Sequence, residues 1–142
     1  MTLPDVNVLL AAFRDEHEDH ALCRRWLERT LASHSAFGIS DLALSAFVRI
    51  ATNPRALRNP NSLEEALAFA EAVRRPSHAV HLSPGPRHWD IFTRLCLETH
   101  VKGTVVADAY YAALAIEHGC ELITVDGDFS RFAGLRYRHP LA

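Results

Sequence analysis

The stretch from Thr104 to Phe129, TVVADAYYAALAIEHGCELITVDGDF, constrains the fold more than any other part of this chain. Its first half has the pattern of a long helix that is apolar nearly all round, and such a helix is usually covered by protein on most sides. Gly119 is suited to the end of that helix, and residues 121–125, ELITV, are typical of a buried strand. The stretch therefore predicts a central helix followed by a strand of a parallel sheet.

Three acidic residues lie at the turns of this stretch. Asp108 falls in the first turn of the predicted helix, and Asp126 and Asp128 follow the predicted strand. A fourth acid, Asp5, comes after a short apolar run near the N-terminus, where it would also suit an ordinary helix cap. In open α/β sheets the carboxyl ends of the strands share one edge, where ligands bind. We therefore expect the acids to meet at that edge.

The rest of the chain alternates short strand candidates with helices of about 10 to 15 residues. This alternation predicts an α/β fold in which a mostly parallel sheet of about five strands carries helices on both faces. With 142 residues and 49% hydrophobic residues, the chain is expected to form one domain spanning residues 1–142. Helices are expected over residues 6–13, 19–33, 41–53, 62–75, 87–99 and 105–118, and the remaining strands near residues 3–4, 36–39, 79–82 and 135–137.

Two of these helices have buried faces that their apolar spacing predicts. The helix over 62–75 begins with a capping box formed by Ser62 and Glu65. Its apolar stripe consists of Leu63, Ala66, Leu67, Ala70 and Val73. The buried face of the helix over 87–99 consists of Trp89, Phe92, Leu95 and Cys96.

Composition excludes several classes of protein. The net charge of −2 does not suit a general polyanion binder, so any contact with nucleic acid requires a local patch. Arg49 and Arg55 could form such a patch, although the favoured explanation is that they are surface arginines, either exposed to solvent or paired. The cysteines are far apart and suit buried thiols. No signal pattern and no uncharged apolar run of about 20 residues is present, which favours a soluble cytoplasmic protein with no membrane contact.

The acids indicate a kind of chemistry when they are taken together. Several carboxylates at one edge would repel one another unless a cation joined them. Oxygen-only ligands suit Mg²⁺ or Mn²⁺, and such an ion activates water for attack on a phosphodiester. Taken singly, each acid is explained as a turn or cap residue. The glycine-rich phosphate-binding motifs and the G-x-S-x-G elbow are absent, and a calcium loop that begins at Asp126 would end on Tyr137 instead of Glu.

Five segments together resemble the PIN-domain family, and within it the VapC-type toxins of bacterial type II toxin–antitoxin systems. They keep the family order along nearly the whole chain. The segments are LPDVNVLLAAF, FVRIATNPR, PGPRHW, ADAYYAALAIEHG and ITVDGDFSRFAGLRY. The resemblance implies a three-layer α/β/α sandwich and a ribonuclease that depends on Mg²⁺ or Mn²⁺. It also implies an RNA substrate, inhibition by a small cognate antitoxin, and a homodimer.

The resemblance also implies roles for particular residues. Asp5 and Asp108 match the first and third family acids and Asp126 the fourth, so these three are expected to be catalytic and to bind the metal. Asp128 matches a frequent acidic neighbour and is a weaker metal ligand. Asn7 and Thr124 are expected to support the acids, and Arg49 and Arg55 to contact RNA.

The second family acid is missing here, because Ala46 occupies the position at which many members carry Glu. Asp41 lies about a turn and a half earlier and could compensate. The substitution leaves the number of metal ions open. It also keeps open a PIN-like binding module with impaired catalysis. A small phosphate- or nucleotide-binding α/β protein is a separate alternative.

Overall fold

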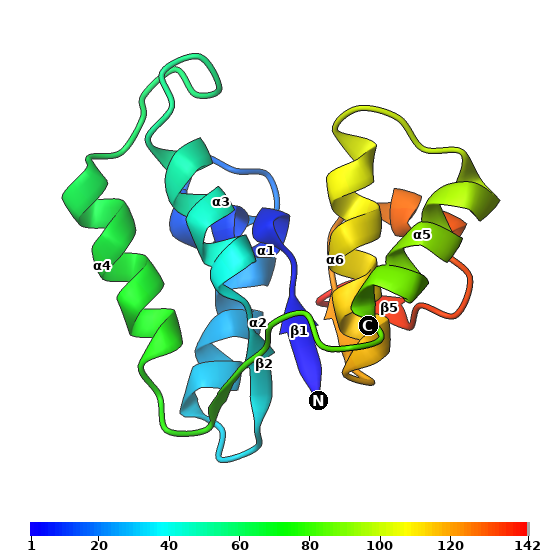
Figure 1. The fold of residues 1–142 in the computed structure, drawn as a ribbon. Helices are drawn as coiled ribbons and strands as arrows, with labels where there is room; N and C mark the ends of the chain where they lie inside the picture. Colours follow the sequence, from blue (N-terminus) through cyan, green and yellow to red (C-terminus); the bar gives the residue numbers. More distant parts are fainter. Residues whose placement is uncertain (142) are drawn as a thin grey trace.

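The computed structural model describes residues 1–141, in which every predicted helix and strand is present near its expected position (Figure 1). The strands are β1 (Thr2–Pro4), β2 (Phe37–Ile39), β3 (Ala79–His81), β4 (Glu121–Ile123) and β5 (Tyr137–Arg138). The α-helices are α1 (Val6–Phe13), α2 (His20–Ala32), α3 (Asp41–Ala51), α4 (Leu63–Arg74), α5 (His88–Thr99) and α6 (Val105–Glu117), and a 3₁₀ helix, η1 (Gly127–Arg131), follows β4. None of the helices described is long and apolar enough to cross a membrane.

All strand pairs are parallel, as the alternation of helices and strands predicts. Hydrogen bonds join β1, β4 and β5 in that order, and β2 and β3 form a separate pair. We expected one continuous sheet, whereas the ladder is interrupted between β1 and β2. The two strands are nevertheless close, because a Cβ atom on Gly38 would lie 3.3 Å from the Thr2 carbonyl oxygen. Strands of two or three residues offer few ladder positions, so strand twist readily separates one pair from the next.

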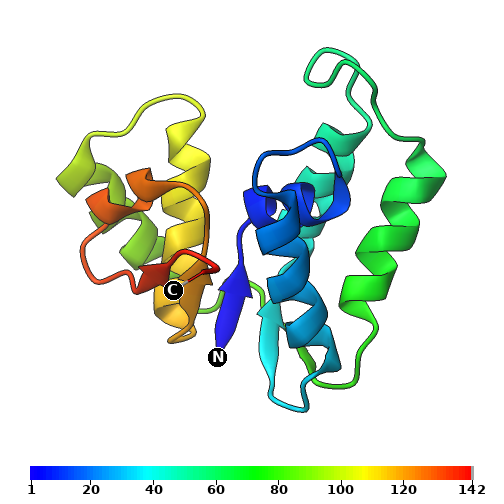
Figure 2. The same cartoon turned by 180° about the vertical axis from the view of Figure 1, so that it is seen from behind.

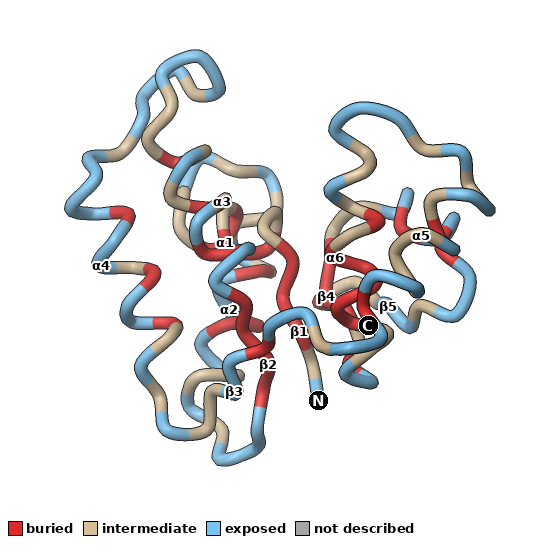
Figure 3. The backbone as a smooth tube through the Cα atoms, in the orientation of Figure 1, coloured by how far each residue is buried: buried red, intermediate tan, exposed pale blue. Residues whose placement is uncertain are grey.

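The helices form two layers with the strands between them, so the fold is a three-layer α/β/α arrangement. Helices α1 to α4 lie on one side of β1, and α5 and α6 lie on the other (Figures 1 and 2). Neighbouring residues of β4 point into different cores: Leu122 packs in the core beneath α5 and α6, and Ile123 in the core beneath α1 to α4. Buried residues gather around β1, α1 and α6, whereas α4 is exposed over much of its surface (Figure 3).

Two predicted buried faces need correction. Trp89 is 64% exposed, and its neighbour His88 is buried instead, with its Nε2 atom 2.9 Å from the Tyr110 carbonyl oxygen. The other three residues of the predicted face still pack in the core, so the correction concerns Trp89 alone. On α4, Leu63 and Leu67 are about half exposed. The reason is that α4 is an outer helix that packs through one narrow stripe, which consists of Ala66, Ala70 and Val73.

Candidate active site

Asp5 joins β1 to α1, and its carboxylate caps that helix. Oδ1 accepts a hydrogen bond from the Val6 N–H at 2.7 Å, and Oδ2 accepts one from the Thr124 hydroxyl at 2.9 Å. The residue is only 8% exposed. Burial raises the pKa of Asp5, the two hydrogen bonds lower it and the charges of Asp108 and Asp126 raise it, so that it lies at about 6. Asp5 is therefore both a helix cap and a buried acid beside other acids.

Thr124 and Asn7 connect the two ends of the chain behind Asp5. The Thr124 hydroxyl oxygen accepts hydrogen bonds from Asn7 Nδ2 and from the Asp126 N–H, both at 3.0 Å. Asn7 Oδ1 accepts a further hydrogen bond from the Val125 N–H at 3.3 Å. Thr124 is only 3% exposed, so its hydroxyl lies at the centre of a buried network. This network fixes the end of β1 against the end of β4.

Asp108 and Asp126 face the same region from two other segments. Asp108 lies in the first turn of α6, where burial and the charge of Asp126 raise its pKa, Arg131 lowers it, and Asp128 raises it. Asp126 lies at the start of η1, and its Oδ1 accepts a hydrogen bond from the Asp128 N–H at 2.8 Å. The effect of Asp126 on the pKa of Asp108 means that the two carboxylates are near neighbours.

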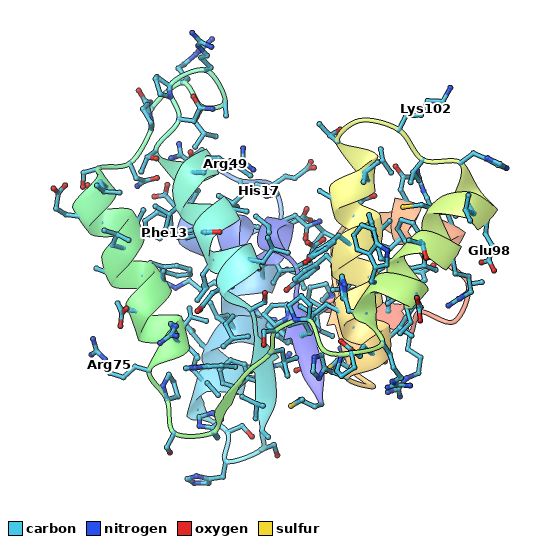
Figure 4. The ribbon with its side chains drawn as sticks, viewed as in Figure 1. Phe13, His17, Arg49, Arg75, Glu98 and Lys102 are labelled. Atoms are coloured by element: carbon cyan, nitrogen blue, oxygen red, sulfur yellow. The ribbon has the colours of Figure 1, made fainter. Side chains whose placement is uncertain are left out.

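These acids line a single cavity of about 680 Å³. Asp5, Asp108 and Asp126 all contribute to its wall, together with Asn7 and Arg49. Helices α3 and α6 border it from opposite sides of β1 (Figure 1). Arg49 projects from the last turn of α3, at the same end of the molecule as the loop that carries Lys102 (Figure 4). The structure thus brings together three acids, and the first and last of them, Asp5 and Asp126, are more than a hundred residues apart in sequence.

Two residues of the expected set lie outside this cavity. The Asp128 side chain is 77% exposed and forms an ion pair of 3.5 Å with Arg131. Arg55 is exposed on the loop after α3, where its N–H donates a hydrogen bond to Asn53 Oδ1 at 3.0 Å. Neither lines the cavity.

Asp41 does not compensate for the missing second acid. It accepts hydrogen bonds from Arg74 Nε at 2.8 Å and from Arg74 Nη2 at 3.2 Å, and this pairing lowers its pKa. The carboxylate therefore faces α4. Ala46 does line the cavity, so its methyl group stands where many family members are expected to carry a carboxylate.

The chemistry of the donors fits a hydrated divalent cation. The acids that line the cavity offer carboxylate oxygens, and the raised pKa values of Asp5 and Asp108 reflect burial and repulsion that a cation would relieve. Within residues 1–141, no group of three or more His, Cys, Asp or Glu side chains is close enough to hold an ion between them. Such an ion could still be held here, because Mg²⁺ keeps several waters and takes only one or two carboxylates directly.

The sequence did not reveal two parts of this region. Arg131 lies close enough to Asp108 to lower the pKa of that carboxyl group. The only signal for Arg131 in the sequence is its spacing of three residues from Asp128. The aromatic side chains of Phe92 and Tyr110 also line the cavity. Their spacing is that of ordinary core residues, so no sequence signal distinguishes them.

Two features define the class of protein. The fold is a parallel α/β/α sandwich, and carboxylates meet at the carboxyl ends of β1 and β4. The PIN domain family model matches residues 2–135, and the chain belongs to the PIN-domain family. Among its relatives are Ribonuclease VapC25 and Ribonuclease VapC31 of Mycobacterium tuberculosis. Each is 41% identical over 140 residues, which cover 99% of this chain and 99% of the relative.

Solved structures share the fold. VapBC2 from Rickettsia felis, bound to a DNA fragment from its promoter, superimposes with a TM-score of 0.71 and 16% identity, covering 97% of both chains. A toxin–antitoxin complex from Klebsiella pneumoniae gives a TM-score of 0.61 and 20% identity, covering 99% of this chain and 98% of that chain. The predicted PIN-like fold is therefore confirmed by both family and structure.

Proposed function

We propose that this protein is a divalent-metal-dependent endoribonuclease and the toxin of a toxin–antitoxin pair. The observation that carries the proposal is the meeting of Asp5, Asp108 and Asp126, from three distant segments, in one cavity. Burial and repulsion raise the pKa of Asp5 to about 6, and a site built in this way favours a cation. Support comes from full-length relatives that are named ribonucleases.

In this proposal Asp5 and Asp108 hold Mg²⁺ or Mn²⁺, and Asp126 completes the site through water. Such an ion, when bound, supplies a polarised water for attack on phosphorus and stabilises the oxygen that leaves. Thr124 and Asn7 keep Asp5 and β4 in place through the buried network. Asp128 is a weaker candidate, because it must first turn away from Arg131.

The remaining polar residues act on the substrate. Asp126 orients the attacking water through Oδ2, because Oδ1 already accepts a hydrogen bond from the Asp128 N–H. Arg49 contacts a phosphate of the RNA at the rim of the cavity, because a guanidinium matches phosphate geometry. Arg55 contacts the RNA backbone farther out, on the exposed loop after α3.

The proposal includes partners and a compartment. A small cognate antitoxin is the inhibitor, which the likeness to a toxin–antitoxin complex supports. The working form is a homodimer in the cytoplasm, as the resemblance to the toxin family implies. Mass measurement of the purified protein alone and after co-expression with the upstream gene tests both partners.

Cleavage of RNA tests the central proposal. Purified protein with Mg²⁺ or Mn²⁺ is expected to cut RNA, whereas EDTA or the Asp5→Asn substitution stops cleavage. Asp90→Asn is the matched control, because Asp90 is exposed on α5 and does not line the cavity. Equal cleavage by wild type and Asp5→Asn, or by EDTA-treated protein, would contradict the proposal.

A second candidate is a PIN-like module that binds its partner without catalysis. The observation that favours it is Ala46, which lines the cavity in place of an acid. Calorimetric titration separates the two functions. The module would bind neither Mg²⁺ nor Mn²⁺ and would still form a tight complex with the neighbouring gene product, whereas the ribonuclease binds the ion.

A further inference from the structure

The wall of the cavity that holds the acids also contains many apolar side chains. We use the term apolar half for six of its apolar or aromatic residues: Leu42, Ala46 and Ile50 on α3, Phe92 on α5, and Val106 and Tyr110 on α6. The α3 residues are spaced by four, so they share one face of that helix. Val106 and Tyr110 are also four apart. The apolar half therefore lies between two helix faces and α5.

The acids and the apolar half lie against different sides of α6. The charged groups that act on Asp108 are Asp126, Asp128 and Arg131 of the segment after β4, and Asp108 in turn acts on Asp5 at the end of β1. Tyr110 packs instead against α5, where its ring lies 5.3 Å from the Phe92 ring at an interplanar angle of 73°. Residues two apart on a helix face different directions, so Asp108 and Tyr110 line the cavity from different sides of α6.

The apolar half is accessible from solvent. Leu42 is 46% exposed, and Ala46, Ile50, Phe92 and Tyr110 are all partly exposed. Apolar surface that faces water in a concave site is unfavourable until a ligand covers it. A volume of about 680 Å³ is also in the range of roughly 300–1,000 Å³ found for sites that enclose whole organic ligands. The cavity is thus larger than one hydrated ion and a phosphate need.

We propose that this apolar half binds the base of a nucleotide next to the cleaved phosphate, held out of its stack. The inference rests on the proposed ribonuclease function. When a phosphate lies at the acids, the base of an adjoining nucleotide must lie within reach of the same cavity. A base that is stacked in a duplex cannot enter a concave site, whereas an unstacked base can pack on aromatic and apolar side chains.

Ala46 has a defined part in this proposal. It lies between Leu42 and Ile50, one turn from each, and its methyl group leaves the space that a longer side chain would fill. The residue that departs from the expected acid therefore makes the base site possible. Filling that space is a direct way to remove the site without touching an acid.

The first experiment measures cleavage of oligonucleotides that lack one base beside the cleaved phosphate. The cleavage position is mapped on an oligonucleotide that the wild type cuts, and an abasic nucleotide is placed on either side of it. Loss of one base is expected to lower kcat/KM roughly 5- to 150-fold, as for loss of a base–aromatic stack. Ala46→Leu should lower kcat/KM for the intact substrate by a similar factor. The variant should then cleave the intact and the abasic substrate with the same kcat/KM.

Matched variants accompany this experiment. Ala68→Leu adds the same side chain on the exposed face of α4 and should behave as the wild type. Ala46→Val is made beside Ala46→Leu, and thermal melting selects the variant that folds. Indifference of the wild type to abasic nucleotides on both sides would overturn the proposal. So would normal cleavage by the filled variant together with weaker inhibition by the antitoxin, because the apolar half would then belong to the protein partner.

The second experiment does not depend on cleavage. Asp108→Asn protein is titrated with oligonucleotides that carry 2-aminopurine, whose fluorescence falls when it stacks on an aromatic ring. Quenching at one position, lost on adding Ala46→Leu, supports the base site even if the wild type proves to cut no RNA. Cleavage by the wild type without such quenching overturns the base site and leaves the ribonuclease proposal standing.

Discussion

Replacing Asp5 by Asn is expected to stabilise the metal-free protein at neutral pH. The folded protein raises the pKa of Asp5 from its ordinary 3.8 to about 6, chiefly through burial. One pKa unit corresponds to roughly 1.4 kcal/mol, so the ionised carboxylate destabilises the fold by about 3 kcal/mol at neutral pH. The favourable contribution of the protonated acid is complete below the unfolded pKa and is lost as the pH rises from about 4 through 6.

Asn removes the buried charge and loses part of the hydrogen bonding. Its amide oxygen can still accept the Val6 N–H, since Asn caps helices about as well as Asp. Its NH₂ group cannot accept the Thr124 hydroxyl proton that Oδ2 now accepts, which costs about 1 kcal/mol. The net expectation is a gain of about 2 kcal/mol near pH 7.5 and no gain near pH 4.5.

Urea unfolding in EDTA at both pH values, with wild type and variant compared at each, measures this difference. Asp90→Asn serves as a control, because it removes an exposed carboxylate outside the cavity. A variant that is destabilised equally at both pH values would refute the reasoning, because the buried charge would then carry no free-energy cost. Added Mg²⁺ should stabilise the wild type and the Asp90→Asn control but not Asp5→Asn, by about 2.7 kcal/mol at a hundred times the dissociation constant.

Three further outcomes are expected. Arg49→Ala should weaken RNA binding at every sequence and lower the slope of log affinity against log salt by about 1, measured by fluorescence anisotropy, with Mg²⁺ affinity unchanged. Ala46→Glu places a carboxylate in the cavity wall and should tighten Mg²⁺ binding in a calorimetric titration while lowering the melting temperature in EDTA. Gly119→Ala should destabilise by about 1 kcal/mol in urea unfolding, because Gly119 has φ of 65° at the end of α6; an added Cβ atom would meet no neighbour there, so the cost is that of the left-handed backbone alone.

The sequence predicts those features of the fold and candidate site that depend on neighbours along the chain. Asp5, Asp108 and Asp126 could be placed because each stands where a strand or helix begins or ends, and parallel strands share one edge. The interruption between β1 and β2 could not be predicted, because it depends on how very short strands twist against each other.

Other features depend on contacts across the fold. His88 and Trp89 both suit a partly apolar helix, and only the hydrogen bond to the Tyr110 carbonyl decides which of them is buried. The pairing of Asp41 with Arg74 also has no local signal, since the two lie on different helices. The apolar half of the cavity follows from α3 facing α6, which periodicity within either helix does not encode.

The hydrogen bond between Asp5 and Thr124 joins residues 119 positions apart, and this separation bears on synthesis of the protein. A ribosome releases the first acid early, but Thr124 and Asp126 must leave the exit tunnel before the network can close. Until then β1 has no β4 to pair with, and the cavity lacks one of its acids. A nascent or prematurely terminated chain therefore carries no assembled nuclease site, so the cell meets the activity only after almost all of the described chain has been translated.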